Sequence, residues 1–246
     1  MKLVTYTLML FIVLNSKAQQ MKEIGIGILE VNTNSDISFF KNFNDVTPAA
    51  ILHIEQLKDL LVKYESPIVL NPYQISEGET DIEVQELLNS GLVPAGPILK
   101  FIVTEATSNY YKVIVDDKKG TKYYIKKSPE AMYYTTRKAL EGSFNTEPSN
   151  RVWFLYETWE HYLKRVEYIE LKKLEIYDKP YGEIIFCSET YDFYPFKVKS
   201  IKGEWIELIK DPLREFNFKK GTNYEGWYQW KTGNEWQIQI VEYTIE

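Results

Sequence analysis

Residues 174–230 consist of short segments separated by turns. They read Leu174-Glu175-Ile176-Tyr177-Asp178-Lys179-Pro180-Tyr181-Gly182-Glu183-Ile184-Ile185, then Phe196-Lys197-Val198-Lys199, Gly203-Glu204-Trp205-Ile206-Glu207-Leu208-Ile209 and Gly226-Trp227-Tyr228-Gln229-Trp230. Each segment alternates and is rich in aromatic and β-branched residues, which is typical of strands. The pattern predicts a small antiparallel β-barrel whose first hairpin turns at Pro180 and Gly182.

Residues 24–127 carry a similar pattern, which indicates an internal duplication. The expected strands are residues 24–31, 36–41, 101–103, 110–115 and 123–125. Positions of the first half correspond to positions of the second as follows: Phe101 to Phe196, Val103 to Val198, Tyr110 to Trp205, Val113 to Leu208, and Tyr124-Ile125 to Trp227-Tyr228. The sequence therefore predicts a mainly β fold made of two small antiparallel barrels.

The segments between these strands are less regular. Residues 49–62 fit a helix that starts at Thr47-Pro48, but residues 51–54 fit the return strand of a hairpin equally well. The similar hairpin at Pro180 favours the second interpretation. Residues 81–88 predict a short helix, and the helical spacing of apolar residues in 153–165 predicts an amphipathic helix that packs through Trp159.

The closing sequence is similar to a known family. Gly226-Trp227-Tyr228-Gln229-Trp230-Lys231-Thr232-Gly233-Asn234, with Lys202-Gly203-Glu204-Trp205, resembles the last two strands of bacterial SH3-like (Src homology 3) domains. More closely, the chain resembles exported proteins of Bacteroidetes-type bacteria that combine a leader, an aromatic-rich β domain, a Thr-Trp-Glu helix, here Thr158-Trp159-Glu160, and a C-terminal SH3-like domain.

This resemblance implies an organisation and a broad function. The expected parts are a signal peptide (1–18), an N-terminal β domain that is a divergent SH3-like unit (19–128), a linker with a helix (129–165) and a C-terminal SH3-like barrel (166–246). Such barrels are binding or spacer modules rather than catalysts. The first loop of the family carries asparagine, arginine and glycine, whereas this chain has Asp178-Lys179-Pro180-Tyr181-Gly182 there, so peptidoglycan binding is not carried over.

The first eighteen residues predict export. Lys2 precedes the apolar run Leu8 to Leu14, and Ser16-Lys17-Ala18 supplies the small residues of a cleavage site. The run is shorter than the ~20 apolar residues that span a bilayer. Cleavage after Ala18 would make Gln19 the new N-terminal residue. A lipoprotein carries a cysteine at that position, so the sequence does not support a lipid anchor. The expected location is the periplasm or the outside; the alternative is that these residues begin the fold.

The charge of the chain narrows its partners. The formal net charge is −6 at pH 7, and it becomes about −8 without Lys2 and Lys17. Nucleic acids and anionic membranes are bound by clustered basic residues, so neither is an expected partner. No segment beyond the leader is long and apolar enough for a membrane span. The expected partner is an envelope protein, peptide or glycan, and the sequence leaves the oligomeric state open.

No catalytic motif stands out. The candidates are His53, His161 and Cys187, the only cysteine, and none of them has a recognisable catalytic partner nearby in the sequence. Cys187 ends a strand pattern and is expected to be a buried structural thiol. No metal-binding or phosphate-binding motif is present, so we expect no catalytic residues, no metal and no other cofactor. The acidic residues are numerous but form no recognisable glycosidase pair.

The aromatic residues are the remaining candidates for function. Strand alternation places Tyr228 and Trp230 on one face and Trp227 on the other. We expect Tyr194, Trp205, Trp227 and Trp230 to line a shallow groove that binds an extended peptide or a sugar, with burial in the core as the alternative. The sequence thus favours an exported, non-enzymatic binding protein of the bacterial envelope. The alternatives are an envelope hydrolase with an unrecognised carboxylate site, and a secreted inhibitor or immunity-type protein.

Overall fold

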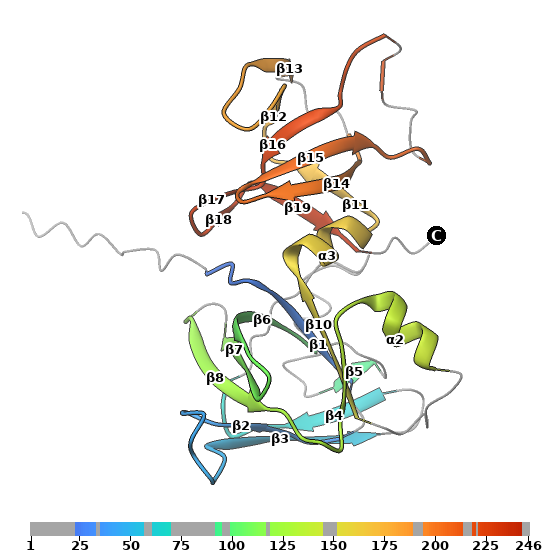
Figure 1. The fold of residues 1–246 in the computed structure, drawn as a ribbon. Helices are drawn as coiled ribbons and strands as arrows, with labels where there is room; N and C mark the ends of the chain where they lie inside the picture. Colours follow the sequence, from blue (N-terminus) through green and yellow to red (C-terminus); the bar gives the residue numbers. More distant parts are fainter. Residues whose placement is uncertain are drawn as a thin grey trace, which may run out of the picture.

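The computed structural model describes residues 23–32, 35–56, 61–69, 92–94, 99–116, 119–144, 152–188, 194–213, 218–219 and 221–242. Within these residues the protein is mainly β, with several sheets, none of which closes into a barrel. In Figure 1 the C-terminal sheet lies above the N-terminal sheets, with helix α3 (Trp159–Arg165) between them. The predicted signal peptide (1–18) and the predicted helix at 81–88 lie outside the described residues.

The N-terminal half contains one large and one smaller sheet. Among the described residues the large sheet has the order β8 (Thr121–Lys126), β7 (Tyr110–Asp116), β6 (Leu99–Ala106), β1 (Gly27–Val31), β10 (Trp153–Thr158) and β9 (Met132–Tyr134). Neighbours are antiparallel except β9 and β10, which are parallel. The smaller sheet has the order β2 (Ile37–Phe39), β3 (Ala50–Gln56), β4 (Leu61–Glu65) and β5 (Leu92–Pro94).

The hairpin interpretation of residues 49–62 is confirmed, because β3 returns antiparallel to β2 with Ile37 opposite Leu52. A backbone bridge between Phe40 and Tyr124 then joins the end of β2 to β8 of the large sheet. This bridge fixes the β2–β3 loop against the end of the large sheet.

The C-terminal half is built on one larger sheet and a short ribbon. The described strands follow the order β13 (Ile184–Ser188), β12 (Leu174–Tyr177), β16 (Gly226–Gln229), β15 (Trp205–Lys210), β14 (Phe196–Lys202), β11 (Tyr168–Leu171) and β19 (Ile238–Val241). The ribbon pairs β17 (Lys231–Thr232) with β18 (Glu235–Trp236). The predicted hairpin at Pro180 and Gly182 is the β12–β13 pair.

The predicted duplication is present in the strand pairing. The order β8-β7-β6-β1-β10 matches β16-β15-β14-β11-β19, and the strands also follow each other in the same order along the chain. The registers agree as well, because Val103 faces Val113 in the first half and Val198 faces Leu208 in the second. In both halves the register shifts directly after this pair, at a β-bulge. The two units therefore share one pattern of pairing and one bulge position.

The predicted helix at 153–165 is wrong over its first half. Residues 153–158 form β10 of the N-terminal sheet, and only Trp159–Arg165 is helical. The helix begins where the Thr158 side chain accepts a hydrogen bond from the His161 backbone, which is a typical N-cap. A second helix, α2 (Arg137–Ser143), starts after the N-cap Thr136 in a stretch that the sequence suggested was only linker.

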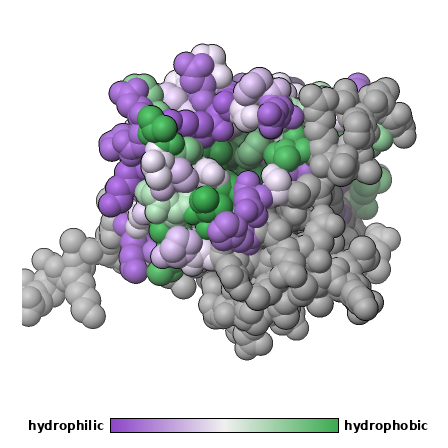
Figure 2. All heavy atoms as spheres, turned by 90° about the horizontal axis from the view of Figure 1, so that it is seen from below, coloured by the Kyte–Doolittle hydropathy of each residue, from purple (hydrophilic) through white to green (hydrophobic). Residues whose placement is uncertain are grey.

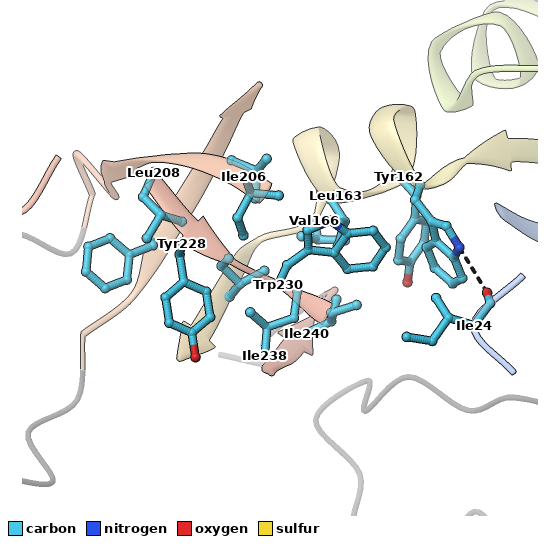
Figure 3. Close-up of a cluster of buried hydrophobic side chains, with 14 of the residues drawn as sticks. Ile24, Tyr162, Leu163, Val166, Ile206, Leu208, Tyr228, Trp230, Ile238 and Ile240 are labelled. Carbon is cyan, nitrogen blue, oxygen red and sulfur yellow. Dashed lines mark hydrogen bonds between the residues drawn. The ribbon is translucent and has the colours of Figure 1, made fainter. Parts of the chain in front are cut away.

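One core cluster extends across both halves. Ile24, Ile28, Ile102 and Ile114 of the N-terminal half pack in it with α3 and the C-terminal sheet, while a separate cluster fills the far side of the large N-terminal sheet. Trp159 Nε1 donates to the Ile24 carbonyl at 3.0 Å, the dashed line in Figure 3. Among the described residues no helix has the length and apolar character needed to cross a membrane.

Candidate functional site

Most of the predicted groove residues are buried. Tyr194, Trp205 and Trp230 are 6%, 5% and 2% exposed, and only Trp227 is half-buried. A shallow groove lined by all four side chains is therefore not formed. The predicted division of faces is correct, because Tyr228 and Trp230 point into the core and Trp227 does not.

Two of these aromatics are held in the core by their neighbours. Trp230 donates from Nε1 to the Gly203 carbonyl at 3.0 Å, and its ring lies 5.2 Å from that of Trp236. Tyr194 packs 5.5 Å from Tyr224. Both side chains are thus accounted for by packing, and neither is available to a ligand.

Trp205 differs from the other buried tryptophans. Its indole lies between two tyrosine rings, with centroids 5.2 Å from Tyr177 and 5.2 Å from Tyr181. Both contacts are edge-to-face, the favourable geometry for aromatic pairs. Its Nε1 is buried and has no hydrogen-bond partner among the described residues. A buried N–H without an acceptor costs free energy, about 1–3 kcal/mol, so such a donor calls for an explanation.

The residue that covers Trp205 is exposed. Tyr181 lies at the tip of the β12–β13 hairpin, and 82% of it is accessible to solvent. Its φ of 61° is in the left-handed region that non-glycine residues rarely adopt. The turn holds this conformation, because the Asp178 side chain accepts from the Glu183 backbone at 2.8 Å and the Asp178 backbone donates back to the Glu183 carbonyl. In the sequence, Tyr181 could have been recognised as an aromatic residue between the turn residues Pro180 and Gly182.

The thiol and the two histidines were the sequence candidates for catalysis. Cys187 is exposed on β13, so the expectation of a buried thiol is wrong; β13 is an edge strand, and its burial alternates so that Phe186 faces inward. His53 Nδ1 is 2.7 Å from an Asp36 carboxylate oxygen, and both side chains are largely exposed. His161 Nδ1 is 3.2 Å from the Thr135 carbonyl.

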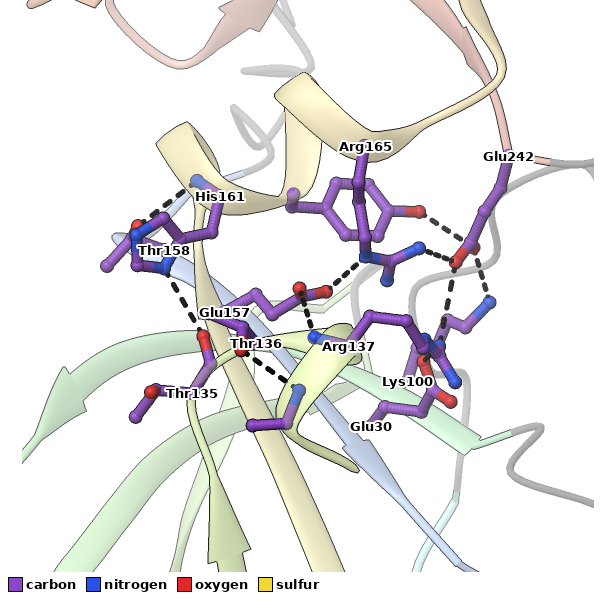
Figure 4. A network of polar contacts seen from close by, with 12 residues as sticks. Glu30, Lys100, Thr135, Thr136, Arg137, Glu157, Thr158, His161, Arg165 and Glu242 are labelled. Atoms are coloured by element: carbon purple, nitrogen blue, oxygen red, sulfur yellow. Dashed lines mark hydrogen bonds and ion pairs between the residues drawn. The ribbon is translucent and has the colours of Figure 1, made fainter. Parts of the chain in front are cut away.

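A network of three acidic and three basic side chains lies between the two halves, as Figure 4 shows. Glu242 follows β19 and receives hydrogen bonds from Lys100 Nζ at 2.6 Å, Arg165 Nη1 at 2.7 Å and the Tyr162 hydroxyl at 2.9 Å. Lys100 belongs to β6, whereas Tyr162 and Arg165 belong to α3. The end of the C-terminal sheet is thereby tied to the N-terminal sheet and to the helix between them.

The remaining members extend this network towards α2. Arg165 Nε donates to Glu157 of β10 at 2.6 Å, and the Arg137 backbone donates to the other oxygen of Glu157 at 3.1 Å. The Arg137 guanidinium pairs with Glu30 of β1. The ionic network, defined as Glu30, Lys100, Arg137, Glu157, Arg165 and Glu242, balances its formal charges within itself.

The pKa values of Glu242 and Glu30 in this network shift in opposite directions. Burial tends to raise the pKa of Glu242, but Lys100 and Arg165 outweigh it and bring that pKa down to about 2. Burial also raises the pKa of Glu30, and there the opposing effect of Arg137 and Lys100 is too small to reverse it. A separated pair of carboxyl pKa values is one feature of acid–base catalysis. Here, however, Glu30 and Glu242 are each 2% exposed, so the geometry suits an ionic link between the halves.

Comparisons of the chain with protein families, with curated proteins and with solved structures found no match. The functional argument therefore depends on the geometry of the described residues.

Proposed function

We propose that the chain is an exported, non-enzymatic binding protein of the bacterial envelope, built from two SH3-like units. We propose further that Tyr177, Tyr181 and Trp205, here called the C-terminal aromatic site, bind an extended peptide. The site differs from the groove expected from the sequence, because it keeps Trp205 but replaces the other three aromatics with tyrosines of the first hairpin.

The strand order supports the SH3-like assignment. The five matching strands of each half form an antiparallel series. The first strand along the chain lies between the second and the last, and the third and fourth strands continue the sheet beyond the second. In each half the long connection between the first two strands of the series carries the aromatic that lies on the sheet. Since one fold can host many functions, this assignment supports a binding role only together with the site.

The observation that carries the proposal is the Trp205 N–H, which is buried and lacks an acceptor among the described residues, in an indole that packs 5.2 Å from the exposed ring of Tyr181. A ligand carbonyl is the natural acceptor for such a donor. Tyr181 lies at a hairpin tip with most of its surface in solvent, so a change of its rotamer would uncover the indole edge without disturbing the core.

An extended peptide fits these groups well. Its carbonyls are unpaired along the chain, and one of them can accept from Trp205 Nε1. Proline-rich segments add flat apolar rings that pack on tyrosine faces, and they are already extended, so little conformational entropy is lost on binding. Proline has no N–H, so such a segment presents acceptors to the site without needing acceptors in return.

Isothermal titration of the full chain with a proline-rich decapeptide tests this proposal. Tyr181→Ala should weaken binding at least fivefold, because it removes a contact surface, and Trp205→Phe should weaken it similarly by removing the donor. Phe144→Ala, at a 58% exposed position after α2, is the matched control and should bind as the parent does. Equal peptide affinity in all three variants, or binding of a chitin hexamer but no peptide, would overturn the proposal.

A further inference from the structure

The N-terminal half carries an aromatic surface at positions equivalent to the C-terminal aromatic site. Tyr110 opens β7 as Trp205 opens β15, and Tyr124 lies on β8 where Trp227 lies on β16. These equivalences follow from the registers, since Val113 faces Tyr123 and Leu208 faces Gly226. Phe43, in the long connection between β1 and β6, covers Tyr110 as Tyr181 covers Trp205.

From this equivalence we infer that Phe43, Tyr110 and Tyr124, together with Lys112, form a second peptide site whose ligand is an extended acidic peptide. These four residues are called the N-terminal aromatic site. The inference rests on the proposed function for the mode of binding, and it adds a second location and a charge preference.

The aromatic rings of this site form a continuous surface. Phe43 stacks on Tyr110 with centroids 5.4 Å apart and planes at 24°, and Tyr124 meets Tyr110 edge-to-face at 5.2 Å. Phe43 is 49% exposed, so the surface ends in an apolar ring that faces solvent. Seen from below, the N-terminal half shows hydrophobic side chains standing among hydrophilic ones at its surface (Figure 2).

The loop that carries Phe43 is held in place before any ligand arrives. The Phe40 backbone exchanges hydrogen bonds with Tyr124 at 2.9 and 2.8 Å, which attaches the start of the loop to β8. The Asn42 backbone donates to the Asp45 carboxylate at 2.9 Å, and Lys126 Nζ donates to the Asp45 carbonyl. A preorganised aromatic surface loses little entropy on binding, so its contacts contribute more fully to affinity.

The charges decide the class of peptide. Lys112 faces Tyr124 across the strand pair, with its Nζ 5.2 Å from the ring centroid. The equivalent position opposite Trp227 is Glu207, whose carboxylate pairs with Lys199 at 2.7 Å, so a carboxylate takes the place of the lysine there. Lys41 is exposed beside the loop. Two acids lie nearby, Glu105, which accepts from the Tyr110 hydroxyl, and Asp45, which accepts from Asn42. Both keep their negative charges, but they are outnumbered by Lys41, Lys112 and Lys126, whose Nζ donates to the Asp45 carbonyl. A ligand carboxylate is therefore favoured at the N-terminal aromatic site over the C-terminal aromatic site, where Glu207 already occupies Lys199.

Titration of the full chain with three synthetic peptides, (Pro-Glu)5, (Pro-Gln)5 and (Pro-Lys)5, tests the inference. We expect (Pro-Glu)5 to bind best, and to lose at least tenfold in affinity with Phe43→Ala and with Lys112→Glu. Lys138→Glu makes the same charge change at an exposed position on α2 and should leave this affinity within twofold of the parent. Raising the salt concentration should weaken (Pro-Glu)5 more than (Pro-Gln)5, because surface charge pairs are screened.

The variants separate this inference from the proposed function. Tyr181→Ala should reduce (Pro-Gln)5 binding and leave (Pro-Glu)5 binding unchanged. If Tyr181→Ala leaves (Pro-Gln)5 binding unchanged while Phe43→Ala still abolishes (Pro-Glu)5 binding, the proposed C-terminal aromatic site is wrong and the N-terminal aromatic site is supported. No saturable binding of (Pro-Glu)5, unchanged (Pro-Glu)5 affinity in both Phe43→Ala and Lys112→Glu, or binding of an oligogalacturonate in place of the peptides overturns the inference.

Discussion

Glu242 offers the sharpest test of how the two halves are joined. Its side chain is buried and receives three hydrogen bonds, two of them from charged groups, Lys100 and Arg165. Replacement by glutamine keeps the shape but removes the charge, which leaves two cations facing a neutral amide. Removing one partner of a buried ion pair typically costs about 3–5 kcal/mol of unfolding free energy.

The pKa of Glu242 gives an independent magnitude. A carboxyl whose pKa falls from 4.5 to about 2 on folding stabilises the folded state by about 3 kcal/mol at neutral pH. Because the folded pKa is depressed, this stabilisation is complete above the unfolded value and disappears as the pH falls through the range from about 5 to 2. Glu30 acts in the opposite direction, since its raised pKa means that its contribution declines as the pH rises.

Urea unfolding at pH 7, followed by tryptophan fluorescence, measures this effect. We expect Glu242→Gln to lose about 3–5 kcal/mol and to be less sensitive than the parent to acidification between pH 5 and pH 2. The control is Glu160→Gln, which removes an exposed i,i+4 pair with Lys164 and should leave the unfolding free energy close to that of the parent. A loss below about 1 kcal/mol for Glu242→Gln would refute the role given to the ionic network.

Two further substitutions test the packing around Gly25 and Trp159. Gly25→Ala should lower the free energy of unfolding, measured in urea, by at least ~2 kcal/mol. Gly25 has φ +64°, and an added Cβ would lie 2.3 Å from the Val103 carbonyl oxygen. An unchanged unfolding free energy would contradict this packing. Trp159→Phe should lower the free energy of unfolding by about 2–3 kcal/mol, because it removes the hydrogen bond to Ile24 and part of the contact with Trp236. Thermal unfolding should show a lower Tm, and an unchanged Tm would contradict the role of these contacts.

The positions of several strands were predictable from the sequence. Turn residues and runs of β-branched and aromatic residues mark β6 to β8 and β12 to β16, although the first five residues of β6 are all buried and do not alternate. The correspondence of Val113 with Leu208 could be read from pattern alone, and the pairing bears it out. The helix predicted at 153–165 failed because aromatic residues on both sides of the strand–helix junction at Thr158 combine into an apparent helical spacing.

The sites were less accessible to sequence reasoning. Alternation separates the two faces of a strand but does not say which face another element covers, so the burial of Trp205 and the exposure of Cys187 were both missed. The ionic network joins Lys100 to Glu242, 142 residues apart, and Glu30 to Arg137, 107 residues apart. Such pairs leave no local pattern, because only the packing of the two halves brings them together.

The indole N–H resonance of Trp205 reports directly on peptide binding at the C-terminal aromatic site. In a ¹H–¹⁵N spectrum of the full chain, with the resonance assigned by its loss in Trp205→Phe, titration with (Pro-Gln)5 should shift this signal downfield and saturably as a peptide carbonyl accepts the proton. The other indole signals of the core, including that of Trp230, should stay in place. A Trp205 signal that does not move while the peptide binds would contradict the proposed site.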